Sequence, residues 1–344
     1  MRTRHRHVLT IAAAAALWAP SVAADPVAEF YKGRTLTVLV GQEPATGYDI
    51  YGRLLARHIG RHIPGHPNTI VQNMPGASGI NSANYLFGVA PKDGTVIATF
   101  TPNVIVEPLM RNPAARYGLA SMGWIGNMEE GASMCGFRAD AGIARFEDLR
   151  QREVVVGATG PTGPLGLAAR SINVLAGTKL KIIYGYKGSA SVRLAIEKGE
   201  VQGVCGLTWS TIKATWKDEI AAGKFRPVVQ SSAAPVPELV SLGAVHIDKY
   251  LETEEQRQMA ELLFGTMVLG RVFAISADAP APRADALRKA FWAAMQDKEL
   301  HADAAKTGVE LTAATGDDVA ARVKRFYAAP PAIVEQVKKI SAGS

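Results

Sequence analysis

The sequence predicts an α/β fold with largely parallel sheets, divided between two domains. Short apolar runs bounded by glycine and proline are typical of buried strands, and they recur along most of the chain. Helical patterns alternate with these runs, as expected for strand–helix–strand units. The chain has 344 residues, which is enough for two domains of ordinary size.

The first third repeats one local design, in which an apolar run is followed by a small-residue loop and then a helical pattern. We expect strands at 35–41, 68–74 and 94–100 and helices at 48–59 and 80–90, with loops at 43–47, 75–79 and 101–103. Ligand sites of parallel sheets lie at the carboxyl ends of the strands. The glycine, serine and threonine residues of this region stand at those ends.

The middle and last thirds continue the alternation. We expect strands at 133–140, 153–158, 179–186 and 201–208, and helices at 146–151, 165–177, 189–199 and 209–223. The run 225–232 is expected to return to the first sheet, before a proline-rich crossover at 233–243. A helix at 254–270, a strand at 271–277 and a helix at 280–298 come next, and two or three shorter helices finish the chain. The predicted domains are 25–125 with 226–344, and 126–225.

The first 24 residues have the pattern of a secretory signal peptide. Three arginines precede the apolar stretch 8–19, which is too short to span a bilayer, and small residues follow at 21–24. A membrane anchor is the alternative. Removing the signal would lower the formal net charge from +7 to +4, because it carries three arginines and no acid. We therefore expect a periplasmic protein, and no run of basic residues suggests nucleic-acid binding.

The two cysteines, Cys135 and Cys205, are expected to form a disulfide. Both lie in strand-like runs of the middle region, and an exported chain folds where disulfides persist. A sheet could bring the two runs side by side. The alternative is two separate buried thiols, which behave as small apolar residues.

Three glycine-rich turns between strands and helices indicate an anion site. They are 46–49, 75–79 and 160–163. Backbone N–H groups at the positive end of a helix favour a carboxylate or phosphate. Asp49 is expected chiefly to cap its helix and to organise the loop before it. Ser78, Thr162 and Ser189 each have two interpretations, as a helix cap or as a ligand contact.

No metal site or enzyme motif is predicted. His58 and His62 are one helical turn apart, but Pro64 separates them from His66, and no acid or cysteine has matching spacing. The turn at 76–80 lacks the second glycine of a nucleophile elbow, and no P-loop or dinucleotide fingerprint is present. We expect no cofactor. Trp209 has two interpretations, as a pocket wall or, more commonly, as a core residue.

Several motifs together resemble the solute-binding proteins of tripartite tricarboxylate transporters, also called Bug receptors. The motifs are VGQEPATGYDIYGRLLARHI, NMPGASG, APKDGTVI and YGYKGSASVRLAIEKGEVQGV, and the likeness covers nearly the whole mature chain. The resemblance implies an extracytoplasmic two-domain binding protein with a type II-like periplasmic binding fold and a ligand cleft between the domains. It also implies a small carboxylate ligand and delivery to a membrane carrier of one large and one small subunit, by a receptor expected to be monomeric.

The resemblance also implies which residues meet the ligand. The set is Gly47, Tyr48, Asp49, Ala77, Ser78, Thr159, Thr162, Gly163, Ser189 and Thr208. Thr101 is a further candidate contact, because it starts the loop after the strand expected at 94–100. Two segments depart from the usual pattern. The first loop carries Glu43 and Tyr48 where glycines are usual, and the segment 205–209 lacks an acidic ending. The identity of the carboxylate therefore does not follow from the family.

Two other functions compete with the binding receptor. A secreted hydrolase of small esters would use Ser78, and loss of activity on Ser78→Ala would favour it. A ligand-sensing partner of a membrane kinase would use the same cleft, and capture of a sensor ectodomain would favour it.

Overall fold

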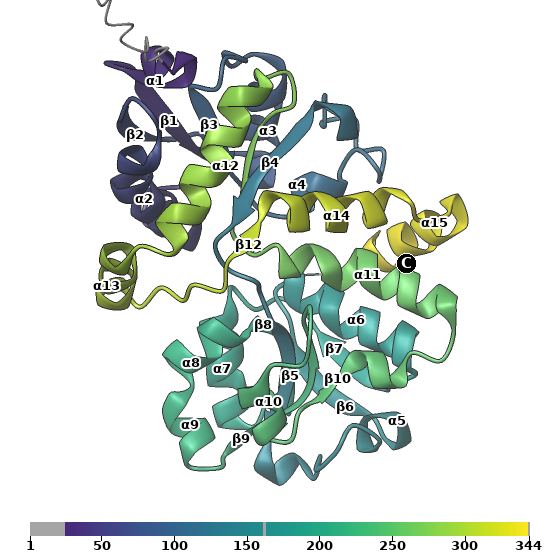
Figure 1. The fold of residues 1–344 in the computed structure, drawn as a ribbon. Coiled ribbons are helices and arrows are strands. Elements are labelled where there is room, and N and C mark those ends of the chain that lie inside the picture. The colour runs from purple at the N-terminus through teal and green to yellow at the C-terminus, as the bar shows by residue number, and fades with distance from the viewer. Residues whose placement is uncertain (1–24, 161–162, 343–344) are drawn as a thin grey trace, which may run out of the picture.

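The computed structural model describes residues 25–160 and 163–342, and the predicted signal peptide lies outside these ranges. Two six-stranded sheets divide the chain into two lobes, as the sequence predicts. Figure 1 shows the lobes one above the other, with the N-terminal residues in the upper lobe. The prediction of a two-domain α/β fold is therefore confirmed.

The first sheet combines strands from both ends of the described chain. Its strands are β1 (Thr35–Val40), β2 (Asn68–Asn73), β3 (Val96–Thr99), β4 (Met122–Asn127), β11 (Val272–Ser276) and β12 (Ala314–Thr315), in the order β12-β4-β11-β3-β1-β2. Both neighbours of β4 come from the last third of the sequence. The first sheet is therefore built from two separate parts of the chain.

The second sheet is built from one continuous part of the chain. Its strands are β5 (Ser133–Arg138), β6 (Val154–Gly157), β7 (Leu180–Ile183), β8 (Gly203–Thr208), β9 (Phe225–Ser231) and β10 (Val245–His246), in the order β10-β9-β5-β8-β6-β7. The prediction that 225–232 returns to the first sheet is wrong, because β9 pairs antiparallel with β5. The second lobe thus extends past residue 225. A fully buried strand looks the same in sequence whichever sheet receives it.

Helices cover both sheets. The first lobe has α1 (Pro26–Tyr31), α2 (Gly47–Ile59), α3 (Ile80–Gly88), α4 (Asn103–Val106), α12 (Ala281–Met295), α13 (Lys298–Thr307) and α14 (Gly316–Tyr327). The second lobe has α5 (Asp148–Gln151), α6 (Pro164–Ala176), α7 (Ser189–Lys198), α8 (Trp209–Thr215), α9 (Lys217–Ala221) and α10 (Pro237–Ser241), and α11 (Glu254–Val268) and α15 (Pro331–Ala342) pack together beside α6. Short 3₁₀ turns are η1 (Gly60–His62), η2 (Ala77–Gly79), η3 (Leu119–Ser121), η4 (Ala139–Ala141) and η5 (Ile247–Tyr250).

Two of the expected helices are each divided. The run 209–223 forms α8 and α9, which meet at Trp216, and the run 280–298 ends at Met295 before α13 begins. No helix in the described part of the chain has both the length and the apolar character needed to span a membrane.

In both sheets, the parallel strands end at the boundary between the lobes. β2 and β3 run parallel to β1, and β4 runs the same way because β11 lies antiparallel to both β3 and β4. Residues 128–132 then lead from β4 directly into β5, so β4 ends and β5 begins at the boundary. β8 and β9 lie antiparallel to β5, and β6 and β7 run parallel to β8. The carboxyl ends of the parallel strands in the two sheets therefore face each other.

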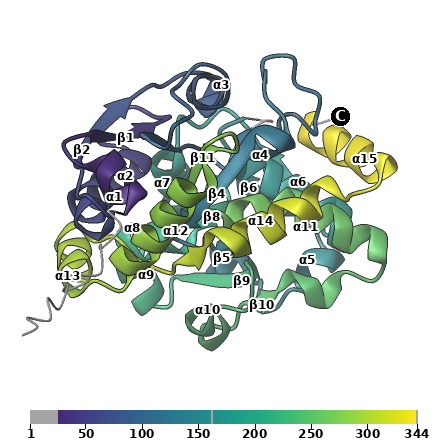
Figure 2. The ribbon, with the colours of Figure 1, turned by 45° about the horizontal axis from the view of Figure 1, so that its top comes forward.

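The lobes share one hydrophobic core along one side. It runs from Phe87 and Phe100 of the first lobe through Leu262 of α11 and Val337 of α15 to Ile172 of α6. Figure 2 shows α11, α14 and α15 gathered on this side. A second core lies between the first sheet and α1, α2 and α12, and a third lies beneath α7 and α8. The opposite side of the boundary has polar links instead, described below.

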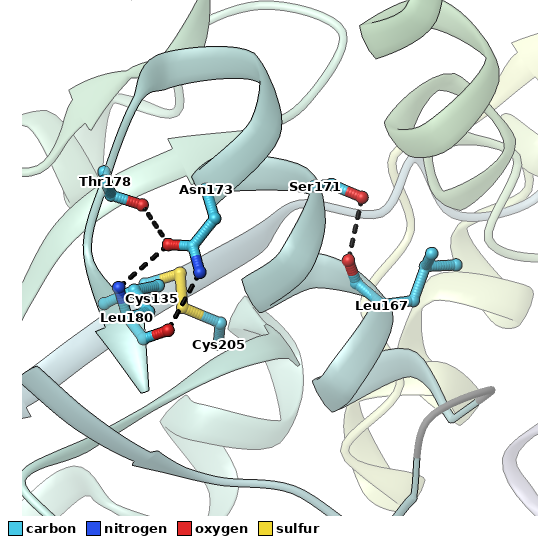
Figure 3. Close-up of a disulfide and its surroundings, with 7 residues drawn as sticks. All are labelled: Cys135, Leu167, Ser171, Asn173, Thr178, Leu180 and Cys205. Carbon is cyan, nitrogen blue, oxygen red and sulfur yellow. Dashed lines mark hydrogen bonds between the residues drawn. A yellow bond between two sulfur atoms is a disulfide. The ribbon is translucent and has the colours of Figure 1, made fainter. Parts of the chain in front are cut away.

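The predicted disulfide between Cys135 and Cys205 is confirmed. The two residues face each other on the antiparallel strands β5 and β8, with their Cα atoms 4.0 Å apart. Both are about 1% exposed, and the described residues contain no other cysteine. Figure 3 shows the bond beneath α6. The strand pairing is antiparallel although most of this sheet is parallel.

The side chain of Asn173 fastens the turn between α6 and β7. Its Oδ1 accepts hydrogen bonds from the Leu180 N–H (2.9 Å) and the Thr178 hydroxyl (2.6 Å), and its Nδ2 donates to the Leu180 carbonyl (2.8 Å). Gly177 ends α6 in the left-handed region, with φ of 66°, which favours glycine. One amide thus fixes the start of the edge strand β7.

Replacing Asn173 with alanine is expected to lower the free energy of unfolding by about 1–2 kcal/mol, because three hydrogen bonds are lost and the Leu180 backbone groups lose a partner. Urea denaturation followed by circular dichroism would measure the change. Ser171→Ala is the control on the same helix, since its hydroxyl only donates to the Leu167 carbonyl one turn earlier. Equal stability of the two variants would show that the turn holds without Asn173.

Candidate functional site

The loop after β1 is organised by the carboxylate of Asp49. Asp49 is 3% exposed, and its oxygens accept hydrogen bonds from the Ala45 N–H (2.8 Å), Arg53 Nε (2.9 Å) and Asn73 Nδ2 (2.9 Å). Asn73 also donates to the Gln42 carbonyl (3.0 Å). Burial alone would raise the pKa of Asp49, but these hydrogen bonds outweigh it and lower the pKa. The acid therefore ties this loop to the end of β2.

This arrangement corrects the expectation that Asp49 caps α2. A capping acid would accept from the N–H of the N-cap residue Thr46, whereas Asp49 accepts from Ala45, one residue earlier. The Thr46 hydroxyl donates to the Glu43 carbonyl (2.8 Å) and does not cap the helix. The first turn of α2, with Gly47 and Tyr48, thus begins without a side-chain cap.

The loop after β2 holds two predicted site residues in unusual backbone conformations. Ala77 and Ser78 have φ of 47° and 52°, and Ala45 in the first loop has φ of 64°. Five non-glycine residues in the described ranges have positive φ, and three of these five lie in the two loops. Such conformations cluster at binding sites. Of the two interpretations of Ser78, the helix cap is wrong, because Gly79 precedes α3 and no side chain caps that helix.

Thr101 joins the second and third loops of this lobe. Its hydroxyl donates a hydrogen bond to the Ser78 carbonyl. Thr101 lies two residues after the last residue of β3, and Ser78 lies in the loop after β2. This hydrogen bond therefore holds the loops after β2 and β3 together. The structure thus brings Ser78 and Thr101 into contact, and Ala77 and Ser78 remain exposed.

The second lobe presents three loops at the facing edge. Thr159 follows β6, and its carbonyl accepts the Gly185 N–H (3.3 Å) from the loop after β7. Gly163 is the uncapped N-cap residue of α6. Thr162 lies outside the described residues. Ser189 is the first residue of α7 rather than its cap, because Gly188 occupies the N-cap position.

Thr208 is held by the helix that follows it. It ends β8, and its hydroxyl accepts the Thr211 N–H as the N-cap of α8. Trp209 is 7% exposed and packs into the third core, and its indole N–H donates to Glu238 (2.6 Å). The interpretation of Trp209 as a core residue is therefore confirmed.

Three helices begin at the facing edge without a side-chain cap. The helices α2, α3 and α6, which follow strands at this edge, have no side-chain cap. Capping is mixed elsewhere, because Thr208 caps α8 at this same edge, and away from the edge α11, α13 and α14 are capped whereas α12 is not. The first N–H groups of a helix need a partner, and an anion can supply it.

Polar contacts link the lobes beside these loops. Lys213 of α8 pairs with Glu310 of the first lobe (2.5 Å) and with Glu238 of its own lobe (3.2 Å). Within the first lobe, the Tyr51 hydroxyl donates to the Glu310 carbonyl (2.8 Å) and so holds the segment that carries Glu310. Exposed ion pairs of this kind contribute little to stability, so this side of the boundary is held less firmly than the shared core.

The sequence did not indicate Arg271 and Glu129, which lie beside the first loop. Arg271 precedes β11 and Glu129 follows β4, so both stand where the chain crosses between lobes. Arg271 Nε lies 3.6 Å from Glu129 Oε2, and the guanidinium lies over the rings of Tyr48 (4.6 Å to the centroid) and Tyr51 (4.9 Å). A charged residue directly ahead of a fully buried strand was the available signal.

The histidines that suggested a metal are paired with acids of α13. His58 Nε2 lies 3.0 Å from Asp303, and His62 Nε2 lies 2.9 Å from Asp297. Within residues 25–160 and 163–342 no group of three or more histidine, cysteine or acidic side chains is arranged to hold a metal ion.

A pocket of about 220 Å³ lies outside the predicted site. It is formed by the ends of β9 and β10 together with α11 and α14, and none of the predicted site residues lines it. Its charged and titratable lining residues are His246, Asp248, Arg257, Glu261 and Arg322.

Several solved structures have a fold similar to that of this chain. No family model matches the sequence, and no curated protein matches it. A TctC solute-binding protein from Polaromonas has a similar structure, with a TM-score of 0.71 and 18% identity over 90% of this chain and 99% of that one. The periplasmic binding protein BugD has a TM-score of 0.58 and 19% identity, over 90% of this chain and 98% of that one. An R. palustris protein solved with adipate has a TM-score of 0.59 and 17% identity, over 90% of this chain and 97% of that one.

At these identities the likeness concerns the fold. It extends over nearly all of the solved chains, and it agrees with the resemblance carried by the sequence motifs. The chain therefore has the two-lobed fold of the periplasmic solute-binding proteins of the TctC and Bug type.

Proposed function

We propose that this chain is an extracytoplasmic solute-binding protein that captures a small carboxylate between its lobes and performs no catalysis. One observation carries the proposal. The carboxyl ends of parallel strands from both sheets face each other, and helices α2, α3 and α6 begin at that edge without side-chain caps. Such amino ends favour an anion.

The proposed site consists of the loops after β1, β2, β3, β6, β7 and β8. Its residues are those that the sequence indicates, namely Gly47, Tyr48, Asp49, Ala77, Ser78, Thr101, Thr159, Thr162, Gly163, Ser189 and Thr208. Asp49 serves this site by shaping the first loop, and Thr208 by starting α8. The backbone N–H groups of the uncapped helices and the exposed Ser78 hydroxyl are the proposed ligand contacts.

A periplasmic location and membership of the Bug family agree with this role. The buried disulfide fits a chain that folds in an oxidising compartment. The proposed partner is a membrane carrier with one large and one small subunit, which receives the carboxylate from a monomeric receptor. Binding of the carrier subunits to immobilised receptor, stronger with ligand than without, would support this partner. Binding to a kinase ectodomain instead would favour the sensor role.

The ligand is proposed to be a small organic acid, and adipate is a suitable first probe because one structural relative was solved with it. A thermal-shift screen with succinate, adipate, benzoate and nicotinate would test the class, since a ligand of the native state raises the melting temperature. We expect at least one acid to raise the melting temperature and its amide to leave the melting temperature unchanged. The absence of any shift across a wider panel of acids would contradict the proposed function.

Ser78→Ala and Thr162→Val are each expected to weaken binding of the best acid by about tenfold or more. Each removes a hydroxyl that can form a charge-assisted hydrogen bond with a carboxylate. Isothermal calorimetry measures the affinities. Ser241→Ala on α10, whose hydroxyl donates to the Glu238 carbonyl, is the control. Wild-type affinity in both variants would remove these two loops from the site.

A further inference from the structure

We propose that Arg271 is a specificity-determining residue of this site and donates hydrogen bonds to the bound carboxylate at the amino end of α2. The inference rests on the proposed function and adds a cation to a site otherwise made of backbone N–H groups and hydroxyls. Sequence motifs gave no sign of it, because Arg271 lies more than 200 positions after the loop that it meets.

The position of the guanidinium places it at that helix end. A Cβ added to Gly47 would lie 3.0 Å from Arg271 Nη2, so this nitrogen lies directly beside the first residue of α2. Gly47 is exposed, and no side chain caps the helix. A carboxylate that accepts from the first N–H groups of α2 would therefore lie within reach of Arg271. The positive end of the helix and the arginine charge would act on the same anion.

The guanidinium is positioned in advance by its surroundings. It lies over the faces of Tyr48 and Tyr51, its Nη1 donates to the Gly270 carbonyl (2.7 Å), and its backbone N–H donates to the buried Asn127 (2.9 Å). Such contacts restrict the side chain before any ligand arrives, which lowers the entropic cost of binding. The side chain nevertheless retains 20% of its exposure.

Arg271 also has unused hydrogen-bonding capacity. Its Nε is buried and has no hydrogen-bond partner within the described residues, because the Glu129 carboxylate stands 3.6 Å away. Buried donors usually have partners. Arginine presents its donors in a planar fork that matches a carboxylate. A carboxylate at the amino end of α2 would meet Nη2, which lies beside Gly47, while the buried Nε stays on the side of Glu129.

The competing interpretation is that Arg271 only neutralises Glu129, which is 5% exposed. The two interpretations differ in what happens when Glu129 loses its charge. If Arg271 serves only Glu129, then Glu129→Gln makes the arginine dispensable. If Arg271 binds the ligand, its removal weakens binding whether or not position 129 is charged.

The experiment is a double-mutant cycle with Arg271→Gln, Glu129→Gln and the double variant. The probes are adipate, succinate and benzoate, each beside its amide, and the tightest acid is followed by calorimetry. We expect Glu129→Gln to keep the wild-type affinity or increase it. The double variant should bind the acid at least tenfold more weakly than Glu129→Gln does, and its preference for acid over amide should fall by a similar factor.

Two further variants separate charge from folding. Arg271→Lys keeps the charge and should retain most of the preference for acid over amide. Arg283→Gln is the matched control, because Arg283 also lies over an aromatic ring, that of Phe30 (3.4 Å), and donates to the Asp93 carbonyl at the far edge of the same sheet. It should not change affinity. The double variant, which leaves no buried charge unpaired, tests the proposal even if Arg271→Gln alone does not fold.

The outcomes are distinct. Equal affinity and equal acid-to-amide preference in the double variant and in Glu129→Gln would overturn the role of Arg271 while leaving the proposed function intact. A wild-type protein that binds no acid of the panel would overturn the proposed function, and this inference with it.

Discussion

Replacing Cys135 and Cys205 together with alanine is expected to lower the free energy of unfolding by roughly 4 kcal/mol. The bond closes a loop with a sequence separation of 70 residues. In the chain-entropy model a crosslink of this span removes about that much conformational freedom from the unfolded chain. Guanidinium denaturation of the oxidised wild type and of the double variant would measure the difference.

Two comparisons make this result specific to the crosslink. Wild-type protein denatured in the presence of reductant keeps both sulfur atoms, so its stability separates loss of the bond from loss of volume. The single variant Cys135→Ala should resemble the double variant, since either change removes the bond. A loss of less than about 1 kcal/mol in the double variant would show that the unfolded chain is already compact in this region.

Asp49→Ala is expected to lower the free energy of unfolding by about 2–3 kcal/mol and to weaken ligand binding by more than tenfold. The variant leaves Arg53, Asn73 and the Ala45 N–H without their shared acceptor. Asp49→Asn is not a neutral change, because its amide nitrogen would face donors where the carboxylate accepts. We therefore expect Asp49→Asn to lower both the free energy of unfolding and the ligand affinity, by less than Asp49→Ala does. A simple helix cap would instead tolerate asparagine with little effect.

The pH dependence of stability follows from the lowered pKa of Asp49. A carboxyl whose pKa is lower in the folded state stabilises the protein above its unfolded pKa, near 4, and loses this contribution as pH falls through its folded pKa. Melting curves of wild type and Asp49→Asn should therefore converge below about pH 4. Asp285→Ala is the control, because Asp285 is 59% exposed and pairs with Arg288 one turn away on the same helix. A difference between wild type and Asp49→Asn that does not change with pH would contradict this account.

Local chemistry was enough to predict most elements of the fold. The apolar run that became β6 and the glycine that ends α6 are signals contained within a few residues. Strand partners depend on contacts far apart in sequence, and no local pattern records them. This is why β9 was assigned to the wrong sheet, and why β5 and β8 pair antiparallel in a region expected to be parallel.

In the candidate site, too, features within a short stretch of sequence were predictable and contacts between distant segments were not. The three glycine-rich loops could be found because each is continuous in sequence. The interpretation of Ser78 and Ser189 as helix caps was wrong, because Gly79 and Gly188 occupy the N-cap positions of α3 and α7. The meeting of Arg271 and Glu129 beside Tyr48 could not be predicted, since it depends on two segments far apart in the sequence that cross at the lobe boundary.

The strand order of the first sheet has a consequence for the order of folding. β4 pairs only with β11 and β12, which follow it by well over 100 residues. Until those residues arrive, β4 has no partner on either side and β3 has one open edge. The second sheet needs only residues 133–246, and its disulfide lies wholly within them. Contacts distant in sequence form slowly, so the second sheet is expected to form while the first still awaits the end of the chain.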